Sequence, residues 1–133
     1  SQGQQTDAVI LTGHILNALN YVGVIGVELF VTPQGLVVNE FAPRVHNSGH
    51  WTQNGCVIDQ FEQHIRAICG WPLGAAHRHC DAVMKNLIGE DYYQWPQFAA
   101  LGDYNVHLYG KTTVREGRKM GHVNQTKPRK RAP

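Results

Sequence analysis

Two segments of the chain carry apolar residues at the spacing of an amphipathic helix. The first follows Asp7, a good N-cap residue, and continues through Leu19 to the stop signal Asn20. The second covers residues 56–70, and its last residue, Gly70, is of the type that commonly follows a helix. Apolar positions three and four residues apart form one face of a helix, so we predict a helix over each segment.

Between these helices the apolar residues are mostly β-branched or aromatic, which favours strands. Residues 22–31 and 36–41 form two such runs, and the sequence Thr-Pro-Gln-Gly between them predicts a turn. We therefore expect the two runs to pair as an antiparallel hairpin. No regular period continues over residues 42–55, where we expect a loop.

The pattern changes in the second half of the chain, where short apolar runs alternate with polar segments. Residues 71–80 form a linker punctuated by Pro and Gly, and we place a domain boundary near residue 74. A short helix is expected within residues 90–102. The whole pattern predicts an α+β fold. Three short strands are expected over residues 81–89, 104–111 and 118–126.

The hairpin places two carboxylates near each other. A three-residue loop with a bulge at Gly35 would pair Thr32 with Leu36, and this register sets Glu28 opposite Glu40. Their Cβ atoms should then be ~5 Å apart, an arrangement in which like charges repel each other. A loop shorter or longer by one residue would leave the two glutamates diagonal, still within reach of one ion.

Both glutamates belong to apolar runs, and burying an unpaired charge is costly. Either one is protonated, or a lysine or arginine lies between them, or a divalent cation binds both. Oxygen ligation by few carboxylates, completed by phosphate oxygens, is typical of Mg²⁺. A hairpin whose glutamates simply face solvent is the remaining alternative, because strand glutamates are common at sheet edges.

The loop after the second strand is rich in hydrogen-bonding side chains: Arg44, His46, Asn47, Ser48 and His50. Arginine offers a rigid fork for phosphate or carboxylate groups, and loops at strand ends often carry function. Zinc binding by the two histidines is disfavoured, because Asn-Ser-Gly argues against the helix that their spacing needs and no third soft ligand is nearby. The loop therefore favours contact with an anion.

Composition and charge exclude several classes of protein. Hydrophobic residues make up 42% of the 133 residues, so wholesale disorder is not expected. The net charge is +2, but residues 127–133 hold four of the twelve Lys and Arg residues, and the remaining eight are outnumbered by ten acidic residues. The body of the chain is therefore not a general nucleic-acid binder.

The cysteines and the apolar runs indicate a cytoplasmic protein. Cys56, Cys69 and Cys80 form neither a CxxC ligand pair nor the framework of a secreted disulfide protein, so reduced thiols are expected. No apolar run approaches the ~18 residues of a membrane span. The polar N-terminus is no signal peptide, and we expect no membrane partner.

The run GVELFVTPQGLVVNEFAPRVHNSGHWTQNG, residues 26–55, closely resembles the N5-carboxyaminoimidazole ribonucleotide synthases, which are ATPase subunits of phosphoribosylaminoimidazole carboxylase in the ATP-grasp superfamily. Other ATP-grasp enzymes share the hairpin with two glutamates but not PRVHNSGHWT. A second block supports the resemblance: HLYGK at residues 107–111, followed by REGRKMGH at residues 115–122. Glu116 stands where the family usually has proline, a change that should cost loop stiffness.

The resemblance covers residues 7–126 and implies an organisation and a reaction. Residues 1–73 would be the C-terminal half of an ATP-grasp domain, with helices packed on an antiparallel hairpin. Residues 74–126 would be a small β-rich domain, and residues 127–133 a disordered basic tail. With ATP and Mg²⁺ as cofactors, bicarbonate would be phosphorylated, and the carboxyphosphate or CO₂ released from it would carboxylate aminoimidazole ribonucleotide in purine biosynthesis.

The resemblance also implies roles for particular residues. Glu28 and Glu40 would bind Mg²⁺, and Asn39 with Glu40 would contact ATP. A cluster of four cations suits a phosphate dianion, although alone it could equally be a solvated hairpin. Bicarbonate or carboxyphosphate would be bound by Arg44, His46 and Asn47, and the 5′-phosphate of the ribonucleotide by Lys111, Arg115, Arg118 and Lys119.

The N-terminal α/β domain and the lid of such enzymes do not occur in this sequence, so we expect the chain alone to be inactive. The full-length enzyme is expected to be a homodimer, and exposed apolar surface would promote association of this chain. Two alternatives are another ATP-grasp ligase and a non-catalytic module that binds phosphate or metal.

Overall fold

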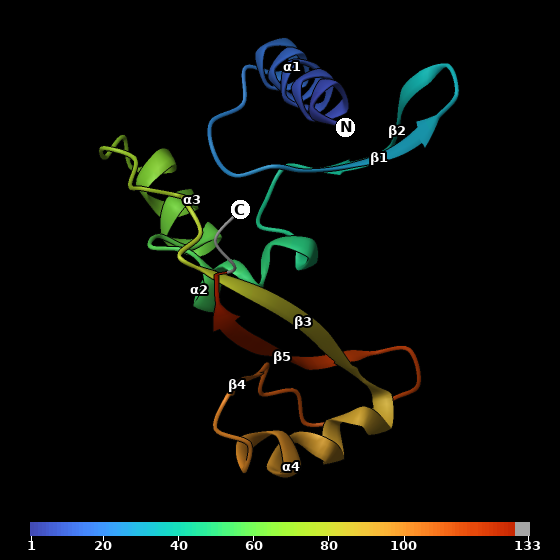
Figure 1. Cartoon of the computed structure of the whole chain (residues 1–133), viewed down its shortest axis with the longest axis vertical. Coiled ribbons are helices and arrows are strands. Elements are labelled where there is room, and N and C mark those ends of the chain that lie inside the picture. The colour runs from blue at the N-terminus through green and yellow to red at the C-terminus, as the bar shows by residue number, and fades with distance from the viewer. Residues whose placement is uncertain (130–133) are drawn as a thin grey trace. The chain divides into compact units, whose positions relative to one another are not determined.

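The computed structural model describes residues 1–129, which form two compact units (Figure 1). The first unit contains Ser1–Gly49 and Gln60–Gly74, and the second contains His50–Asp59 and the residues from Ala75 onward. Each unit combines helices with an antiparallel sheet, so the predicted α+β fold is confirmed.

Helix α1, Gln2–Leu19, begins earlier than the sequence analysis predicts. Its N-cap is Ser1, whose side chain accepts a hydrogen bond from the Gln4 backbone in a capping box, whereas Asp7 lies inside the helix. The prediction was wrong because the Ser-x-x-Gln pattern that starts the helix was overlooked. The predicted end is confirmed: Asn20 caps the helix in the left-handed conformation.

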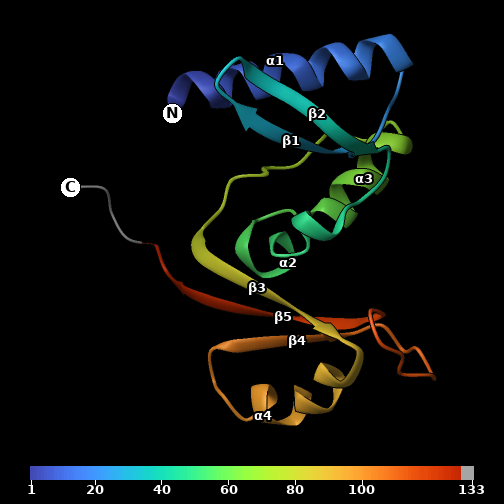
Figure 2. The ribbon, with the colours of Figure 1, turned by 90° about the vertical axis from the view of Figure 1, so that its right-hand side faces the viewer.

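Strands β1, Gly26–Thr32, and β2, Gly35–Ala42, form the predicted hairpin, and α1 runs beside it (Figure 2). The expected three-residue loop is wrong, because Thr32 pairs with Gly35 across a two-residue turn. A bulge between Glu28 and Leu29 then shifts the register by one, and Glu28 pairs with Glu40 as predicted. The pairing is thus correct, but the extra residue lies in β2 at Asn39 rather than at Gly35.

The expected loop over residues 42–55 contains two short helices, η1, Asn47–Gly49, and α2, Thr52–Gly55. The helix predicted over residues 56–70 begins only with α3, Gln60–Ile68. Before α3 the chain is extended, because the Val57 and Ile58 N–H groups donate to backbone carbonyls of the linker.

Helix α3 is attached to the first unit by polar side chains. Gln60 and Gln63 each form two hydrogen bonds with the backbone of one residue, His46 and Gly74 respectively. His64 Nδ1 accepts a hydrogen bond from the Val24 N–H. The apolar residues that predicted the helix, including Phe61, Ile65 and Ile68, are exposed. Their spacing therefore gave the correct element but not the face that packs.

The three strands predicted in the second half are confirmed as β3, Cys80–Ile88, β4, Tyr104–Leu108, and β5, Lys119–Pro128. They form an antiparallel sheet with β5 in the centre. Within this unit α2 lies on one side of the sheet, and η2, Gly89–Gln94, with α4, Trp95–Ala99, lies on the other (Figure 2). Central β5 supplies most of the buried residues, from Met120 to Asn124.

The segment His50–Asp59 lies between the two parts of the first unit in sequence but belongs to the second unit, because it is hydrogen-bonded to the sheet of the second unit. Asn124 on β5 donates to the His50 carbonyl at 3.1 Å and to Asn54 Oδ1 at 2.8 Å. The Asn54 side chain also lies 2.8 Å from His107 Nε2 on β4.

The basic segment begins inside β5, where Lys127 and Pro128 pair with Asp81 and Cys80. The prediction of a disordered tail from residue 127 is therefore wrong for its first residues, and residues 130–133 lie outside the described part. Among residues 1–129 no helix has the length and apolarity to span a bilayer. All three cysteines carry free thiols, as predicted.

Candidate metal and anion site on the hairpin

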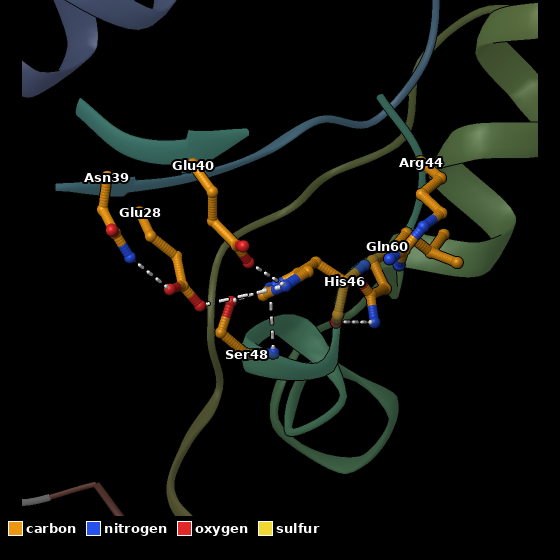
Figure 3. Close-up of polar contacts among 8 residues, drawn as sticks. Glu28, Asn39, Glu40, Arg44, His46, Ser48 and Gln60 are labelled. Carbon is orange, nitrogen blue, oxygen red and sulfur yellow. Dashed lines mark hydrogen bonds and ion pairs between the residues drawn. The ribbon is translucent and has the colours of Figure 1, made fainter. Parts of the chain in front are cut away.

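Three polar side chains project from one side of the hairpin: Glu28, Asn39 and Glu40 (Figure 3). Successive residues of a regular strand point to opposite faces, but the bulge in β2 lets Asn39 and Glu40 share a side. The Asn39 amide donates to Glu28 Oε2 at 3.4 Å. The bulge thus gathers the groups that the sequence analysis assigned to Mg²⁺ and ATP.

His46 faces both glutamates. Its Nε2 is 3.9 Å from Oε1 of Glu28 and 3.9 Å from Oε1 of Glu40 (Figure 3). The His46 side chain is only 14% exposed, whereas the two glutamate side chains are 45% and 61% exposed. The imidazole is therefore nearly enclosed, and the carboxylates that face it remain open to solvent and to ions.

Close contacts from two segments position His46. The Gln60 side chain accepts from the His46 N–H and donates to the His46 carbonyl, each at 2.9 Å. The Nδ1 atom lies 2.8 Å from the Ser48 hydroxyl and accepts a hydrogen bond from the Ser48 N–H at 3.4 Å. Gly26 allows the ring to approach β1, because a Cβ atom at this position would be 2.6 Å from His46 Cβ.

Glu28 and Glu40 are partly exposed, which agrees with the alternative that these glutamates face solvent. No lysine or arginine of residues 1–129 forms an ion pair with either carboxylate, so no described residue is the lysine or arginine considered between them. The three groups fit a divalent ion, because one donor atom from each of Glu28, Glu40 and His46 lies within 4.8 Å of the other two.

Arg44 is not gathered with the carboxylates. The Arg44 guanidinium donates to the Val45 carbonyl at 3.0 Å, and Figure 3 shows it directed away from Glu28 and Glu40. Asn47 begins η1. Of the residues expected to bind the anion, His46 therefore faces the pair of carboxylates and Arg44 does not.

The four predicted phosphate-binding cations lie on neighbouring parts of one loop in the second unit. Lys111 Nζ donates to the Lys119 carbonyl at 2.6 Å, and Arg118 donates to the Thr113 carbonyl at 3.0 Å. The Arg118 N–H closes a turn onto the Arg115 carbonyl at 3.1 Å. Two of the cationic groups thus bind backbone oxygens.

The turn formed by residues 115–118 contains the residue at which the chain differs from the usual family sequence. Glu116 occupies its second position, where proline is favoured, and Gly117 supplies the positive φ of 70° at the third. A cavity of about 530 Å³ beside the turn is lined by three carboxylates, Glu90, Asp91 and Glu116, and by no lysine or arginine of residues 1–129. The cavity itself therefore does not suit a phosphate.

The second unit also contains a buried polar cluster that the sequence analysis missed. The His122 ring is 1% exposed and stacks between the rings of His50 and His107, with centroids 4.8 and 4.6 Å away. Its Nδ1 lies 2.8 Å from the Tyr109 hydroxyl. Burial, and then the neighbouring His107 and His50, lower the pKa of His122 to about 4. The ring is therefore neutral at pH 7.

Two family models match the chain in sequence order. The ATP-grasp domain matches residues 1–61, and the phosphoribosylaminoimidazole carboxylase C-terminal domain matches residues 82–132. The N5-carboxyaminoimidazole ribonucleotide synthase of Brucella melitensis is 58% identical over 116 residues, or 86% of this chain. The chain belongs to the N5-carboxyaminoimidazole ribonucleotide synthase family.

Solved structures of N5-carboxyaminoimidazole ribonucleotide synthetases have the same fold. An ADP complex superposes with a TM-score of 0.88 at 41% identity, covering 96% of this chain and 34% of that one. The Aspergillus clavatus synthase in complex with ADP and 5-aminoimidazole ribonucleotide gives 0.74 at 35% identity, covering 80% and 31%. The chain spans about a third of the curated relatives it matches, 32% for the Brucella melitensis protein.

Sequence reasoning found most of this site but missed the residues that position it. Gln60 and Ser48 hold His46, yet neither belongs to a motif that announces this role. The sequence carries no signal for Gln60, because the burial of this polar residue of α3 is visible only in the structure. Such a residue needs hydrogen-bond partners, which here are the backbone groups of His46.

Proposed function

We propose that a protein containing this chain carboxylates 5-aminoimidazole ribonucleotide with bicarbonate, consuming ATP and releasing ADP and phosphate, in de novo purine biosynthesis. The observation that carries the proposal is the bulged hairpin, which gathers Glu28, Asn39 and Glu40 opposite His46. The names of the relatives support it, as does a related structure containing both ADP and 5-aminoimidazole ribonucleotide.

The residues on the hairpin fit Mg²⁺, with Glu28 and Glu40 as oxygen ligands. The ion would neutralise charge on the ATP phosphates during phosphoryl transfer. The Asn39 amide donates to Glu28 Oε2 and so leaves the other carboxylate oxygen, Oε1, available to the ion. Asn39 and Glu40 would contact ATP. The exposure of both glutamates leaves room for phosphate oxygens.

The loop after β2 supplies the groups for the acceptor of the phosphoryl group. We assign bicarbonate and carboxyphosphate to Arg44, His46 and Asn47, with Arg44 turning from the Val45 carbonyl when an anion offers a stronger partner. The 5′-phosphate of the ribonucleotide is assigned to the cationic loop of the second unit. Its members are Lys111, Arg115, Arg118 and Lys119.

The proposal extends to the setting of the reaction. The enzyme would act in the cytoplasm on small molecules, as a homodimer, and would need neither nucleic acid nor membrane. The 133-residue chain by itself would be inactive, because proximity of the two substrates contributes several kcal/mol to such reactions and needs a complete site.

The test uses a chimera in which this chain replaces the matching third of the Brucella melitensis relative. We expect ADP release that depends on both bicarbonate and 5-aminoimidazole ribonucleotide. Glu40→Gln should lower kcat by about a hundredfold or more, since it removes one charge that binds the ion. Glu62→Gln is the matched control, because Glu62 is a half-exposed glutamate that pairs with Arg66 on α3 and should not affect turnover.

A folded chimera with full activity after Glu40→Gln would overturn the assignment of the metal site. A chimera whose ADP release ignores 5-aminoimidazole ribonucleotide would overturn the substrate. Phosphate binding by the chain that needs no metal and is lost on Arg118→Ala would instead identify a non-catalytic binding module.

A further inference from the structure

We propose that Tyr109 is a positioning residue for the ribonucleotide: its ring holds the Lys111 ammonium in place, and its hydroxyl is fixed by the buried His122. The inference rests on the proposed function in taking Lys111 as a ligand of the 5′-phosphate. It goes further by assigning a role to an aromatic residue that acts through this lysine, and by giving the buried histidine cluster a task in substrate binding.

The Lys111 ammonium has two partners within the second unit. Its Nζ lies 5.6 Å from the centroid of the Tyr109 ring and donates to the Lys119 carbonyl at 2.6 Å. A cation within about 6 Å of an aromatic centroid is attracted by the negative face of the ring. Gly110, between the two residues, has a φ of 66° and turns the chain in a way that favours glycine. The lysine is therefore directed back over the tyrosine ring.

These partners hold the ammonium without neutralising its charge. A backbone carbonyl and an aromatic ring carry no net charge, whereas a carboxylate partner would cancel the charge that a phosphate needs. Burial raises the pKa of Tyr109, so its hydroxyl stays uncharged at pH 7. An ammonium group has three N–H donors, and the Lys119 carbonyl accepts from one of them. Lys111 is thus fixed in place and still able to bind a dianion.

The Tyr109 side chain is itself held by its neighbours. Its backbone N–H donates to the Met120 carbonyl at 3.0 Å, which continues the pairing of β4 with β5 one residue beyond Leu108. Its hydroxyl is 2.8 Å from His122 Nδ1, a hydrogen bond that either tautomer of the neutral imidazole can form. The His50 ring meets the Tyr109 ring edge-on, with centroids 6.1 Å apart.

The histidine cluster makes the anchor of the Tyr109 hydroxyl rigid. The His122 ring is 1% exposed and is stacked between the rings of His50 and His107. His107 is held in turn, because its Nε2 is 2.8 Å from Asn54 Oδ1. An imidazole that is packed on both faces has little freedom to rotate. The hydroxyl therefore has a partner of fixed position, and so does the lysine that lies over the ring.

An ordered lysine should bind the phosphate more tightly than a mobile one, because it loses less conformational entropy when the ligand binds. The 5′-phosphate lies at the opposite end of the ribonucleotide from the amine that is carboxylated. A contact to it should contribute about equally to the ground state and to the transition state. Loss of the Tyr109 ring should therefore raise the KM for 5-aminoimidazole ribonucleotide and leave kcat nearly unchanged.

The experiment uses the chimera in which this chain replaces the matching third of the Brucella melitensis relative. Tyr109→Leu should raise the KM for 5-aminoimidazole ribonucleotide by about tenfold, while kcat changes by less than about twofold. Tyr109→Phe keeps the ring below the ammonium, so its KM should stay within about threefold of wild type. Tyr93→Leu, at a tyrosine of η2 that is 64% exposed, is the matched control and should leave the KM unchanged.

A double-mutant cycle separates positioning from a structural role. Lys111→Ala should raise the KM by about tenfold or more, and adding Tyr109→Leu to it should raise the KM by less than about twofold again. A structural effect of Tyr109 would appear in both backgrounds. A tenfold rise on adding Tyr109→Leu to Lys111→Ala would therefore overturn the inference, as would an unchanged KM in Tyr109→Leu alone.

A measurement on the wild-type 133-residue chain keeps the inference testable if Tyr109→Leu does not fold. Protons above an aromatic face are shielded by the ring current. In the nuclear magnetic resonance spectrum the ε protons of Lys111 should therefore lie upfield of those of Lys127, an exposed lysine of β5. Equal chemical shifts for the two lysines would show that Lys111 does not lie over the ring, and the inference would be wrong.

Ribose 5-phosphate separates this inference from the proposed function, because it carries the same 5′-phosphate but has no amine to be carboxylated. Calorimetry of the chimera should show weaker binding of ribose 5-phosphate after Tyr109→Leu. If this result holds while ADP release ignores 5-aminoimidazole ribonucleotide, the role of Tyr109 stands and the proposed reaction is wrong. If the chimera uses 5-aminoimidazole ribonucleotide but Tyr109→Leu changes neither the KM nor the affinity for ribose 5-phosphate, the reaction stands and the role of Tyr109 is wrong.

Discussion

His46 and His122 are the same kind of side chain in opposite surroundings. The His46 imidazole has two exposed carboxylates 3.9 Å from Nε2, and an ion can reach the space between them. The His122 imidazole is 1% exposed, with an imidazole on either face. The surroundings of His46 are open to an ion, whereas the His122 ring is enclosed and contacts only other parts of the protein. What distinguishes the candidate functional histidine from the structural one is therefore access for an ion, since both residues lie in polar clusters.

The largest effect expected from this contrast is acid sensitivity of the second unit. The folded-state pKa of His122, about 4, lies below the ordinary value of 6.5, so the unfolded chain binds a proton more readily. The stabilisation is complete above pH 6.5 and is lost as the pH falls from 6.5 to 4, by about 3 kcal/mol. Burial likewise lowers the pKa of His107, which adds to the same trend.

Hydrogen exchange followed by nuclear magnetic resonance checks this prediction. Between pH 7 and pH 4.5, after correction for intrinsic exchange rates, amides of β3 and β5 should lose protection while those of β1 and β2 lose less. His122→Gln should be less stable at pH 7 but should have a flatter pH profile. Equal losses of amide protection in both sheets, or a pH profile of stability that is unchanged in His122→Gln, would contradict the predicted effect of the buried histidine.

A smaller effect is expected from Gln60, the buried polar residue that holds the exposed site in place. Gln60→Ala leaves the His46 N–H and carbonyl without these partners and should cost about 2 kcal/mol of unfolding free energy. It should also lower the kcat of the chimera, because the His46 imidazole is no longer fixed. Urea unfolding and the rate of ADP release measure the two effects.

Gln63→Ala is the matched control for this prediction. Gln63 forms the same pair of hydrogen bonds, but with Gly74 rather than with His46. It should lower stability to a similar extent without lowering the kcat of the chimera. Equal losses of kcat in the two variants would show that Gln60 acts on overall stability alone.

The smallest effect expected is a gain, in the exposed cationic loop of the second unit. Glu116→Pro should stabilise the protein by about 0.4 to 1 kcal/mol, because proline restricts the unfolded chain and suits the second position of this turn. Thermal unfolding measures the gain. Glu116→Ala separates stiffness from charge, since it also removes a carboxylate close to Glu90 and Asp91. The Mg²⁺ affinity of the hairpin should not change in either variant.

The hairpin shows how far sequence reasoning reaches. Turn residues and β-branched runs predicted both strands and the pairing of Glu28 with Glu40. The predicted position of the bulge was wrong, because the sequence does not reveal whether the extra residue of the hairpin lies at Gly35 or at Asn39. Helix α3 gives a second case. Its apolar period predicted a helix, but the polar residues Gln60, Gln63 and His64 attach it to the first unit.

The sequence by itself determined the family, the order of the helices and strands, and the residue types that carry the chemistry. These depend on local patterns and on a long run of matching residues. Only the tertiary structure decided that His46 faces the two carboxylates and that Arg44 does not. It also decided that three distant histidines stack in the second unit. Such contacts depend on a bulge, on hydrogen bonds from a helix that follows later in the chain, and on burial, and no local pattern encodes them.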